Sequence, residues 1–372
     1  MSDLFIGLMS GTSLDGVDAV LARFPEAGGA MQSLGHAHQP FSKALREELL
    51  SLNQSGPDEL HRAALAANAL ARSYADLVAQ LLERCALRPQ DIRALGAHGQ
   101  TVRHRPGEFD GIGYTSQLLN GALLAEQSGI SVVCDLRSRD VAAGGQGAPL
   151  VPAFHRAVFG RADESLAVLN IGGISNISLL PADGRTLGFD CGPGNCLMDA
   201  WIAEHQGQDY DAEGSWAAQG QVVPELLLAL LAEPFFAKPP PRSTGRDLFH
   251  RAWLQQHLDR LSTTPRAEDV QATLLELSAR AVADSLRSEE QVLSRLLVCG
   301  GGALNRQLMQ RLQALLPGTQ VARSDEAGLP VMEVEAAAFA WLAMRFVRGL
   351  PGNLPAVTGA AGPRILGALH PA

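Results

Sequence analysis

Long apolar stretches and aromatic residues are both scarce in this chain of 372 residues. The longest unbroken apolar run is Ala336–Met344, well short of the roughly 20 residues that a membrane-spanning helix needs. Residues Met1–Gly7 contain no basic region followed by an apolar stretch, which is the pattern of a secretory signal. Aromatics make up 5% of the chain, so aliphatic side chains must fill the core. The sequence therefore predicts a cytoplasmic protein with no membrane partner.

An excess of positive charge is also missing. Thirty Lys and Arg residues stand against 39 Asp and Glu residues, which gives a formal net charge of −9, and no basic block stands out. This argues against a nucleic-acid partner, because affinity for a polyphosphate backbone comes mainly from cationic neutralisation. A small anionic ligand is still compatible with the sequence, since backbone amides can hold one locally.

Cysteine is infrequent, and no metal-ligand spacing involves it. The five cysteines are odd in number and scattered, and none forms a zinc-type pair. No His, Cys or carboxylate set has the spacing of a metal site. We therefore expect five reduced thiols, namely Cys85, Cys134, Cys191, Cys196 and Cys299.

The residues that are present predict a two-domain α/β protein. Hydrophobic residues make up 46% of the chain, and the length suits two domains of roughly 150–200 residues. Apolar strand patterns alternate with helical spacings such as Leu70, Tyr74, Leu77 and Leu81. The Gly- and Pro-rich stretch Ala142–Pro152 is the best boundary. We therefore expect an N-terminal domain over residues 1–145 and a C-terminal domain over 146–372.

Each predicted half opens with the same pattern, an apolar run, a glycine turn and a second apolar run. Leu4–Met9 and Val17–Leu21 flank the first turn, and Leu166–Ile171 and Ile177–Leu180 flank the second. This pattern indicates a β-hairpin in each half and suggests a duplicated domain. Glycines and small hydroxyl residues in such turns can approach a phosphate, although a single turn of this kind is also typical of a solvated hairpin.

A third glycine turn, Gly300–Gly302, joins a predicted strand to a helix that we expect over Ala303–Leu316. Backbone at such a turn can approach a flat ligand, and the helix N-terminus favours an anion. The turn is not a Rossmann fingerprint, because Asn305 stands where a third glycine is needed, and no Walker A motif occurs. A nucleotide, if one is bound, is held in another way.

Several polar residues lie where chemistry is plausible. Asp190 follows a predicted strand and can act as a general base; the alternative is a helix cap, for which Asn195 is better placed. His98, Gln100 and Thr101 are interpreted as a turn where a sugar can bind, with a hydrogen-bonded loop histidine as the alternative. Glu335 heads an Ala-rich helix and is either an exposed first-turn acid or a cleft residue. A further group, interpreted as a solvated helix start, comprises Arg137, Arg139 and Asp140.

These segments together resemble the anhydro-N-acetylmuramic acid kinase family over almost the whole chain. The motifs that carry the resemblance are GLMSGTSLDGVDAVL (Gly7–Leu21), AHGQTVRH (Ala97–His104), AAGGQGAPLVPAFH (Ala142–His155), LNIGGISNISLL (Leu169–Leu180), GFDCGPGNCLMDAW (Gly188–Trp201), STGRDLF (Ser243–Phe249), CGGGALN (Cys299–Asn305) and EAAAFAWLA (Glu335–Ala343). The resemblance implies an actin/sugar-kinase/Hsp70-like fold, with ATP in the cleft between two related α/β domains.

The resemblance also implies a reaction. Water opens the 1,6-anhydro bridge of anhydro-N-acetylmuramic acid at C1, and the freed O6 takes the γ-phosphate of ATP to give N-acetylmuramic acid 6-phosphate in cell-wall recycling. By resemblance, Asp190 activates the water, and the substrate side includes His98, Gln100, Thr101 and Glu335. Mg²⁺ is expected with ATP, near Asp15 or Asp18, and the protein is expected to be a homodimer. The residues implied in ATP binding are Gly11, Thr12, Ser13, Leu14, Asp15, Gly16, Val17, Asp18, Asn170, Gly172, Gly173, Gly300, Gly301, Gly302 and Asn305.

Two segments depart from the family pattern. Gln117–Gly121 reads Gln-Leu-Leu-Asn-Gly where Gln-Ile-Gly-Asn/Asp-Pro is usual, and His250 stands where Asn is more usual. The first departure leaves open a kinase of another 1,6-anhydrosugar such as levoglucosan. A third hypothesis is a nucleotide-dependent conformational protein like actin or Hsp70, which the intact Asp190 segment disfavours.

Overall fold

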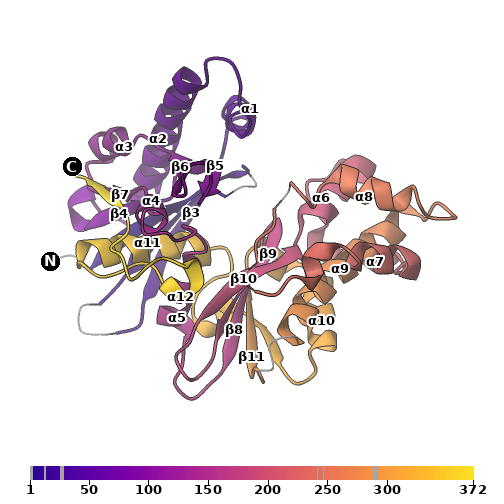
Figure 1. The fold of residues 1–372 in the computed structure, drawn as a ribbon. Coiled ribbons are helices and arrows are strands. Elements are labelled where there is room, and N and C mark those ends of the chain that lie inside the picture. The colour runs from indigo at the N-terminus through magenta and orange to yellow at the C-terminus, as the bar shows by residue number, and fades with distance from the viewer. Residues whose placement is uncertain (1–2, 12–13, 26–28, 241, 246, 288–291) are drawn as a thin grey trace. The chain divides into compact units, whose positions relative to one another are not determined.

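The computed structural model describes residues 3–11, 14–25, 29–240, 242–245, 247–287 and 292–372. They form two compact units (Figure 1). The first unit comprises Met1–Val158 together with Glu333–Ala372, and the second comprises Phe159–Met332. None of the helices formed by the described residues combines the length and the apolar character that a membrane crossing requires.

The first unit is built on a six-stranded mixed sheet. The strands β1, β4 and β7 are parallel, β2 and β3 continue one edge in antiparallel fashion, and β13 pairs antiparallel with β7 at the other. In spatial order, the strands are β13 (Ala368–His370), β7 (Val132–Cys134), β4 (Ala94–Ala97), β1 (Leu4–Met9), β2 (Gly16–Arg23) and β3 (Gln32–Pro40).

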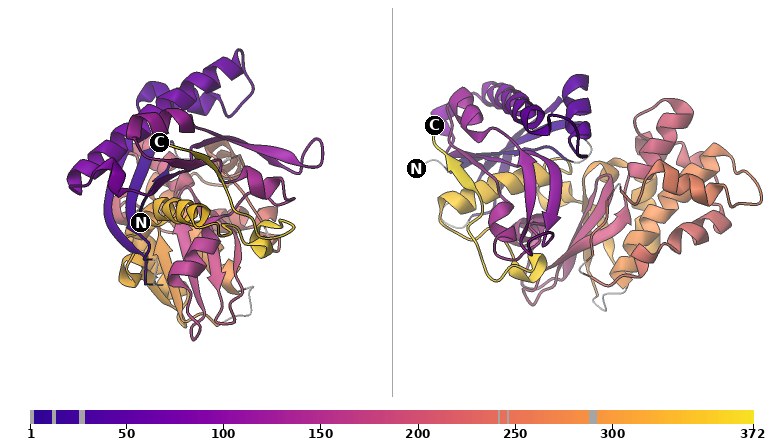
Figure 2. Two further views of the ribbon diagram at one scale, coloured as in Figure 1. Left: turned by 90° about the vertical axis from the view of Figure 1, so that its left-hand side faces the viewer. Right: turned by 45° about the horizontal axis from the view of Figure 1, so that its top comes forward.

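Helices cover both faces of this sheet (Figures 1 and 2). Leu4, Ile6 and Leu8 of β1 pack in one hydrophobic core with the buried side of α2 (Glu59–Arg84). The intervening Gly7 faces α11 (Val334–Val347) on the other side, as period-2 alternation requires. The remaining helices that include first-unit residues are α1 (Lys43–Ser51), α3 (Gly121–Ser128), α4 (Ser138–Val141), α5 (Val151–Phe159) and α12 (Pro355–Thr358).

A two-stranded hairpin, β5 (Gln100–Pro106) with β6 (Gly113–Leu118), follows β4. The sequence prediction treated the start of this segment as a turn and did not foresee the hairpin. Its strands carry polar residues on both faces, so they offer no apolar alternation to detect.

The second unit contains a five-stranded sheet in the order β10 (Leu187–Pro193), β9 (Ile174–Leu180), β8 (Leu166–Ile171), β11 (Arg295–Cys299) and β12 (Gln320–Arg323). Ala167, Leu169 and Ile171 of β8 face one large core that helices from the same unit complete. These helices are α6 (Cys196–Gln206), α7 (Pro224–Leu231), α8 (Arg251–Leu258), α9 (Ala267–Arg287) and α10 (Arg306–Leu315).

The two sheets repeat one design. In the first sheet, β1 pairs antiparallel with β2 and β2 with β3, while β1 is parallel to β4 and β4 to β7. In the second sheet, β8 pairs antiparallel with β9 and β9 with β10, while β8 is parallel to β11 and β11 to β12. This confirms the expected pair of related α/β domains, each opening with a glycine-turned hairpin.

The expected domain limits need correction at the C-terminus. Residues 333–372 were assigned to the second domain but belong to the first compact unit. The physical reason is that α11 packs on β1 and β4, while β13 adds to the edge at β7. A boundary near residue 146, chosen from glycine and proline content, also precedes the change of unit at Phe159.

Candidate functional site

The parallel strands of the first unit end at one edge of its sheet, and a polar residue follows each. Ser10 follows β1, His98 follows β4, and Arg137 lies three residues after β7. Ligands of open α/β sheets bind at the carboxyl ends of the parallel strands. This edge is therefore the candidate ligand-binding part of the first unit.

His98 is a buried, neutral imidazole. Arg137 donates to its Nε2 from Nη2 at 2.9 Å and from Nε at 3.2 Å. Because a guanidinium can only donate, Nε2 accepts, and the proton on Nδ1 is donated to the carbonyl of Ser10 at 3.2 Å. Burial and the charge of Arg137 lower the pKa of His98 to about 3. His98 therefore orients Arg137 and does not exchange protons at neutral pH.

Glu335 and Arg137 are opposite charges at this edge. Glu335 lies in the first turn of α11, and desolvation, together with the charges of Asp18 and Asp15, raises its pKa to about 6 although Arg137 opposes the shift. Burial lowers the pKa of Arg137 to about 10, so the guanidinium stays charged at neutral pH. Arg137 also donates to the carbonyl of Gly147 at 2.8 Å. The pair presents a fixed cation and an acid to a polar ligand.

Asp140, three residues beyond Arg137, is fully buried. It accepts from the backbone of Gly147 at 2.8 Å, from Asn353 Nδ2 at 2.6 Å and from Thr358 Oγ1 at 2.8 Å. The interpretation of this segment as solvated is therefore wrong for Asp140 and Arg137, and correct for the exposed Arg139. No local pattern indicates this burial, because two of the donors to Asp140, Asn353 and Thr358, lie more than 200 positions away.

Gln100 and Thr101 begin β5, and their partners on β6 are Leu118 and Gln117. Gln117 Nε2 donates to Thr101 Oγ1 at 3.2 Å, so the segment that departs from the family pattern lies directly beside the predicted sugar residues. Gln100 donates to the carbonyl of Gly11 at 3.1 Å, while its Oε1 is buried with no hydrogen-bond partner among the described residues.

The first glycine turn is only partly described, since Thr12 and Ser13 lie outside the described residues. Leu14 and Val17 are core residues, so they can offer a ligand only their backbone. A side chain at Gly16 would meet the carbonyl of Gln39 at 2.4 Å, which gives this glycine a packing role. Asp15 is exposed, and it is the carboxylate of this turn that faces solvent.

Asp18, at the start of β2, accepts from two histidines of β3. His36 Nε2 lies 2.8 Å and His38 Nδ1 3.2 Å from Asp18 Oδ1. The hydrogen bond to Asp18 raises the pKa of His36. Among the described residues, no group of three or more His, Cys, Asp or Glu is arranged for a metal ion. Asp15 and Asp18 lie three positions apart in the sequence, and carboxylates are the side chains that Mg²⁺ commonly takes, one or two of them together with phosphates.

In the second unit, the turn Gly172–Gly173 is fixed through its carbonyls. Gly173 O accepts from the backbone of Gly194 at 2.9 Å and of Cys196 at 3.1 Å, and Gly172 O accepts from Asn195 at 2.8 Å. With these carbonyls engaged by the start of α6, the backbone amides are groups that this turn can offer to a ligand. Amide donors are the groups that bind a phosphate.

The third glycine turn packs directly on the same hairpin. Gly300 has a φ of 76°, and a side chain there would lie 2.4 Å from Asn170 Oδ1. A side chain at Gly302 would lie 2.2 Å from Ile171. Gly301 is exposed at the tip. The structure therefore brings the predicted residues Asn170, Gly172–Gly173 and Gly300–Gly302 together at one edge of the second sheet.

Three polar residues that precede helices differ in their roles, and only Asn195 was predicted as a cap. Asn305 caps α10, accepting from Leu308 at 3.0 Å, so its side-chain oxygen has a structural role. Asn195 precedes α6 but makes no side-chain cap; its amide donates to the carbonyl of Ile171 at 3.3 Å instead. His250 caps α8, where Nδ1 accepts from Trp253 at 3.2 Å, a role that an Asn would also perform.

Asp190 lies on β10 next to a β-bulge between Asp190 and Gly192. Its Oδ2 accepts from Ser243 Oγ at 3.0 Å and from the backbone of Thr244 at 2.9 Å. Both of these bonds from described residues reach Oδ2, which leaves Oδ1 as the oxygen for a reacting proton. Burial raises the pKa of Asp190 above its ordinary value, against these two hydrogen bonds and the charge of Arg242.

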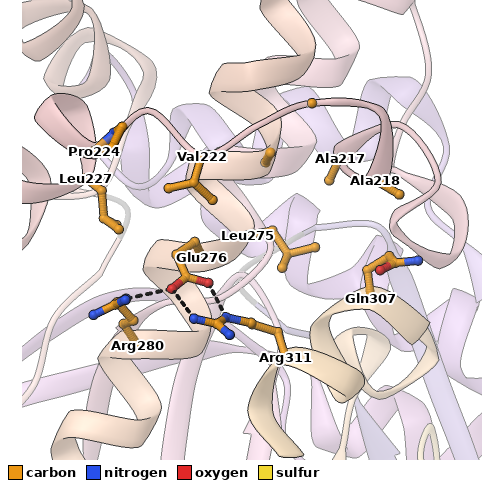
Figure 3. Close-up of a pocket in the computed structure, with 12 residues that line it drawn as sticks. Ala217, Ala218, Val222, Pro224, Leu227, Leu275, Glu276, Arg280, Gln307 and Arg311 are labelled. Atoms are coloured by element: carbon orange, nitrogen blue, oxygen red, sulfur yellow. Dashed lines mark hydrogen bonds and ion pairs between the residues drawn. The ribbon is translucent and has the colours of Figure 1, made fainter. Parts of the chain in front are cut away.

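A cavity of about 480 Å³ lies elsewhere in the second unit (Figure 3). Its walls are mainly apolar, and at one side Glu276 accepts from Arg280 at 2.6 Å and from Arg311 at 2.5 and 2.8 Å. Gln307, in the first turn of α10, lies at the other side. Each charge in this cavity has a partner, so the cavity does not resemble a site of acid–base chemistry.

Comparisons with known proteins are consistent over the whole chain. The model of the family described as anhydro-N-acetylmuramic acid kinase matches residues 3–372. A protein of that name from Variovorax paradoxus is 59% identical over 376 aligned positions, covering 100% of this chain and 99% of its own length. Another from Ralstonia nicotianae is 56% identical, covering 100% and 98%.

Similarity to solved structures is weaker. The activator of the 2-hydroxyisocaproyl-CoA dehydratase from Clostridium difficile, solved with bound ADPNP, aligns with a TM-score of 0.49 and 14% identity. The alignment covers 93% of this chain and 96% of that one. Family membership therefore rests on the family model and the full-length relatives.

Proposed function

Because the chain belongs to the anhydro-N-acetylmuramic acid kinase family, we propose that it is an ATP-dependent sugar kinase. It hydrolyses the 1,6-anhydro bond of anhydro-N-acetylmuramic acid and phosphorylates O6, which yields N-acetylmuramic acid 6-phosphate and ADP. The observation that carries the mechanism is Asp190, a half-buried carboxylate with one oxygen held by Ser243 and Thr244.

Asp190 is the general base. Its Oδ1 takes a proton from water, the water oxygen bonds to C1, and the C1–O6 bond breaks. O6, released with the electron pair of that bond, attacks the γ-phosphorus, and ADP leaves. Asp190 then returns its proton to solvent. Breaking the bridge produces the nucleophile at the position where it reacts, so positioning supplies much of the rate.

The glycine turns bind the nucleotide. The amides of the Gly172–Gly173 turn suit phosphate oxygens, because the carbonyls there are already engaged. The backbone at Gly300–Gly302 approaches the nucleoside, and Asn305 contributes by fixing the start of α10. Mg²⁺ bound with ATP neutralises phosphate charge, and Asp15 and Asp18 are the carboxylates that would hold it.

The sugar side is the edge of the first sheet. Sugar hydroxyls can accept from Arg137 and donate to Glu335, two groups that His98 and burial hold in place. Gln100 has a buried oxygen without a partner among the described residues, and Thr101 lies beside it. We further expect a cytoplasmic homodimer, and light scattering of the purified protein tests the dimer.

The experiment compares Asp190→Asn with Asp183→Asn, the same change in the exposed β9–β10 turn of the same unit. Asp190→Asn should lower kcat by about 10²- to 10⁴-fold, the usual contribution of a general base, with KM for ATP within twofold. Asp183→Asn should behave as wild type. Full activity of Asp190→Asn would remove this residue from the mechanism, and turnover of levoglucosan but not the amino sugar would favour the alternative substrate.

A further inference from the structure

Arg242 is a residue that neither the sequence prediction nor the proposed mechanism uses, and it lies directly behind Asp190. Its guanidinium donates to four acceptors. Nε reaches the carbonyl of Asp190 at 3.0 Å, Nη1 reaches the carbonyls of Phe236 at 3.1 Å and Lys238 at 2.7 Å, and Nη2 reaches Ser285 Oγ at 2.5 Å. One side chain thus joins β10, the end of the short 3-10 helix Pro234–Ala237 with the residue that follows it, and helix α9.

Two aromatic rings lie against the same guanidinium. Its central carbon lies 5.4 Å from the ring centroids of both Phe189 and Phe235, and both rings are buried. A planar cation gains cation–π attraction in this position while its edges remain free for hydrogen bonds. A lysine ammonium is a point charge and cannot contact two rings and four acceptors in the same way.

The backbone of Arg242 is also fixed to Asp190. The amide of Asp190 donates to the carbonyl of Arg242 at 3.1 Å. The next two residues, Ser243 and Thr244, are the donors to Asp190 Oδ2. The position of the carboxylate therefore depends on where residues 242–244 lie.

β10 by itself cannot set that position. It is the edge strand of its sheet, so among the described residues only β9 pairs with it within the sheet, and the bulge at Asp190–Gly192 interrupts even that pairing. Residues 242–244 cover the open side of β10 at the bulge. Such bulges re-aim side chains and need neighbouring contacts to define the new direction.

We propose that Arg242 is a positioning residue for the general base, an inference that rests on the proposed function. It anchors residues 242–244 on the open edge of β10, so that Ser243 and Thr244 hold Asp190 Oδ2 and direct Oδ1 at the reacting water. It does not touch the substrate. Without this anchor, the carboxylate samples other rotamers and loses its two donors.

The acid side of the pH–rate profile reports this role. Among the described residues, Arg242 is the charged group that acts on Asp190, and the neighbouring Cys191 thiol, with a pKa of about 12, stays neutral. Ser243, Thr244 and Arg242 all favour the ionised carboxylate. Their loss raises the pKa of Asp190 further, so the acid limb of kcat moves to higher pH.

The test measures kcat, KM for ATP and the pH profile for wild type, Arg242→Lys and Arg242→Ala with ATP, Mg²⁺ and anhydro-N-acetylmuramic acid. Arg242→Lys should lower kcat at least about tenfold, leave KM for ATP within twofold and shift the acid limb upward by at least about half a pH unit. Guanidinium ion at millimolar concentration should restore part of the activity of Arg242→Ala, because a cavity of about 400 Å³ lined by Arg242 and Ser285 admits it.

Arg295→Ala is the matched control. Arg295 is the first residue of β11 and donates two hydrogen bonds to Glu164, both at 2.6 Å. It therefore lies at the end of β11 opposite to Gly300, which follows the strand. Its loss should leave kcat and the pH profile unchanged.

Wild-type kcat and an unshifted acid limb in Arg242→Lys would overturn the inference, as would equal effects of Arg242→Lys and Arg295→Ala. If Arg242→Ala does not fold, Arg242→Lys, which keeps the charge and most of the stem, decides alone. A wild-type enzyme that does not phosphorylate the sugar refutes the proposed function instead, so the two failures are distinguishable.

Discussion

Two carboxylates with raised pKa values, Asp190 and Glu335, are the centre of this account at the scale of single residues. The sequence identified both positions, because each lies within a recognisable motif. It could not identify their surroundings. Arg137 lies about 200 positions from Glu335, and Ser243 lies 53 positions from Asp190, so only the folded chain shows which donors and charges control them.

Activity should depend on pH through Asp190. Burial raises its pKa above 3.8, the ordinary value. A base must be ionised, so activity is complete above this raised pKa and falls as pH decreases through it. We expect the acid limb of kcat to lie at higher pH than an unperturbed aspartate would give, and steady-state kinetics from pH 3 to 8 measures it. A limb below pH 3.8 would contradict the assignment.

Glu335 should make the folded protein less stable as pH rises. Its pKa is about 6 in the folded protein against 4.5 when unfolded. The folded state thus favours the protonated form, and stability decreases as pH rises from 4.5 through 6. Since a difference of one in pKa between the folded and the unfolded state is worth 1.36 kcal/mol, Glu335→Gln should stabilise the protein by about 2 kcal/mol at pH 8.

Denaturant unfolding of wild type and Glu335→Gln at pH 8 and near pH 4.5 measures this difference. The gain should shrink as pH falls, because wild-type Glu335 then carries its own proton. A variant that is less stable at pH 8 would show that the attraction to Arg137 outweighs desolvation.

At the scale of elements, the contact of α11 with the first sheet places Glu335 at the sheet edge. A side chain at Gly7 would lie 1.8 Å from the carbonyl of Ala336, and one at Gly96 would lie 2.0 Å from the carbonyl of Phe339. The backbone of α11 is thus in direct contact with the backbone of β1 and β4. The sequence predicted α11 and β1 from apolar runs, but the need for glycine arises only when these elements pack.

Gly96→Ala should therefore displace α11. A methyl group 2.0 Å from a helix carbonyl cannot be accommodated without moving the helix, and overpacking of this kind costs about 3 kcal/mol. Chemical denaturation measures the loss of stability, and hydrogen exchange should show reduced protection in α11. Gly318→Ala is the control, because nothing lies within 4 Å of its added carbon, and its effect should stay within about 0.5 kcal/mol. Equal stability of the two variants would contradict the contact.

At the scale of the whole molecule, the chain repeats one sheet design and then returns to its first unit. The repetition was predictable, because a hairpin with a glycine turn opens each half. The return was not. Residues 333–372 rejoin the first unit through α11, through β13 on β7 and through Asn353 and Thr358 on the buried Asp140, and no local pattern records contacts over such distances.

Deletion of residues 351–372 should therefore destabilise the first unit selectively. The deletion removes β13 and two donors to Asp140, and a buried carboxylate that loses its donors is costly. Hydrogen exchange should show lost protection in β4 and β7, with β8 and β11 unaffected. Thr358→Val, which removes one donor alone, should show the same pattern with a smaller loss. Unchanged exchange in β7 would contradict the structural role of the C-terminus.

The most direct test of the central claim follows the oxygen of water. The enzyme is incubated with ATP, Mg²⁺ and anhydro-N-acetylmuramic acid in ¹⁸O-labelled water, and early products are analysed by mass spectrometry, with unlabelled product as the control for exchange. We predict a sugar phosphate with ¹⁸O at C1 and an unlabelled phosphoryl group, formed together with ADP and abolished by Asp190→Asn. Label in the phosphoryl group, or ADP without any phosphorylated sugar, would contradict it.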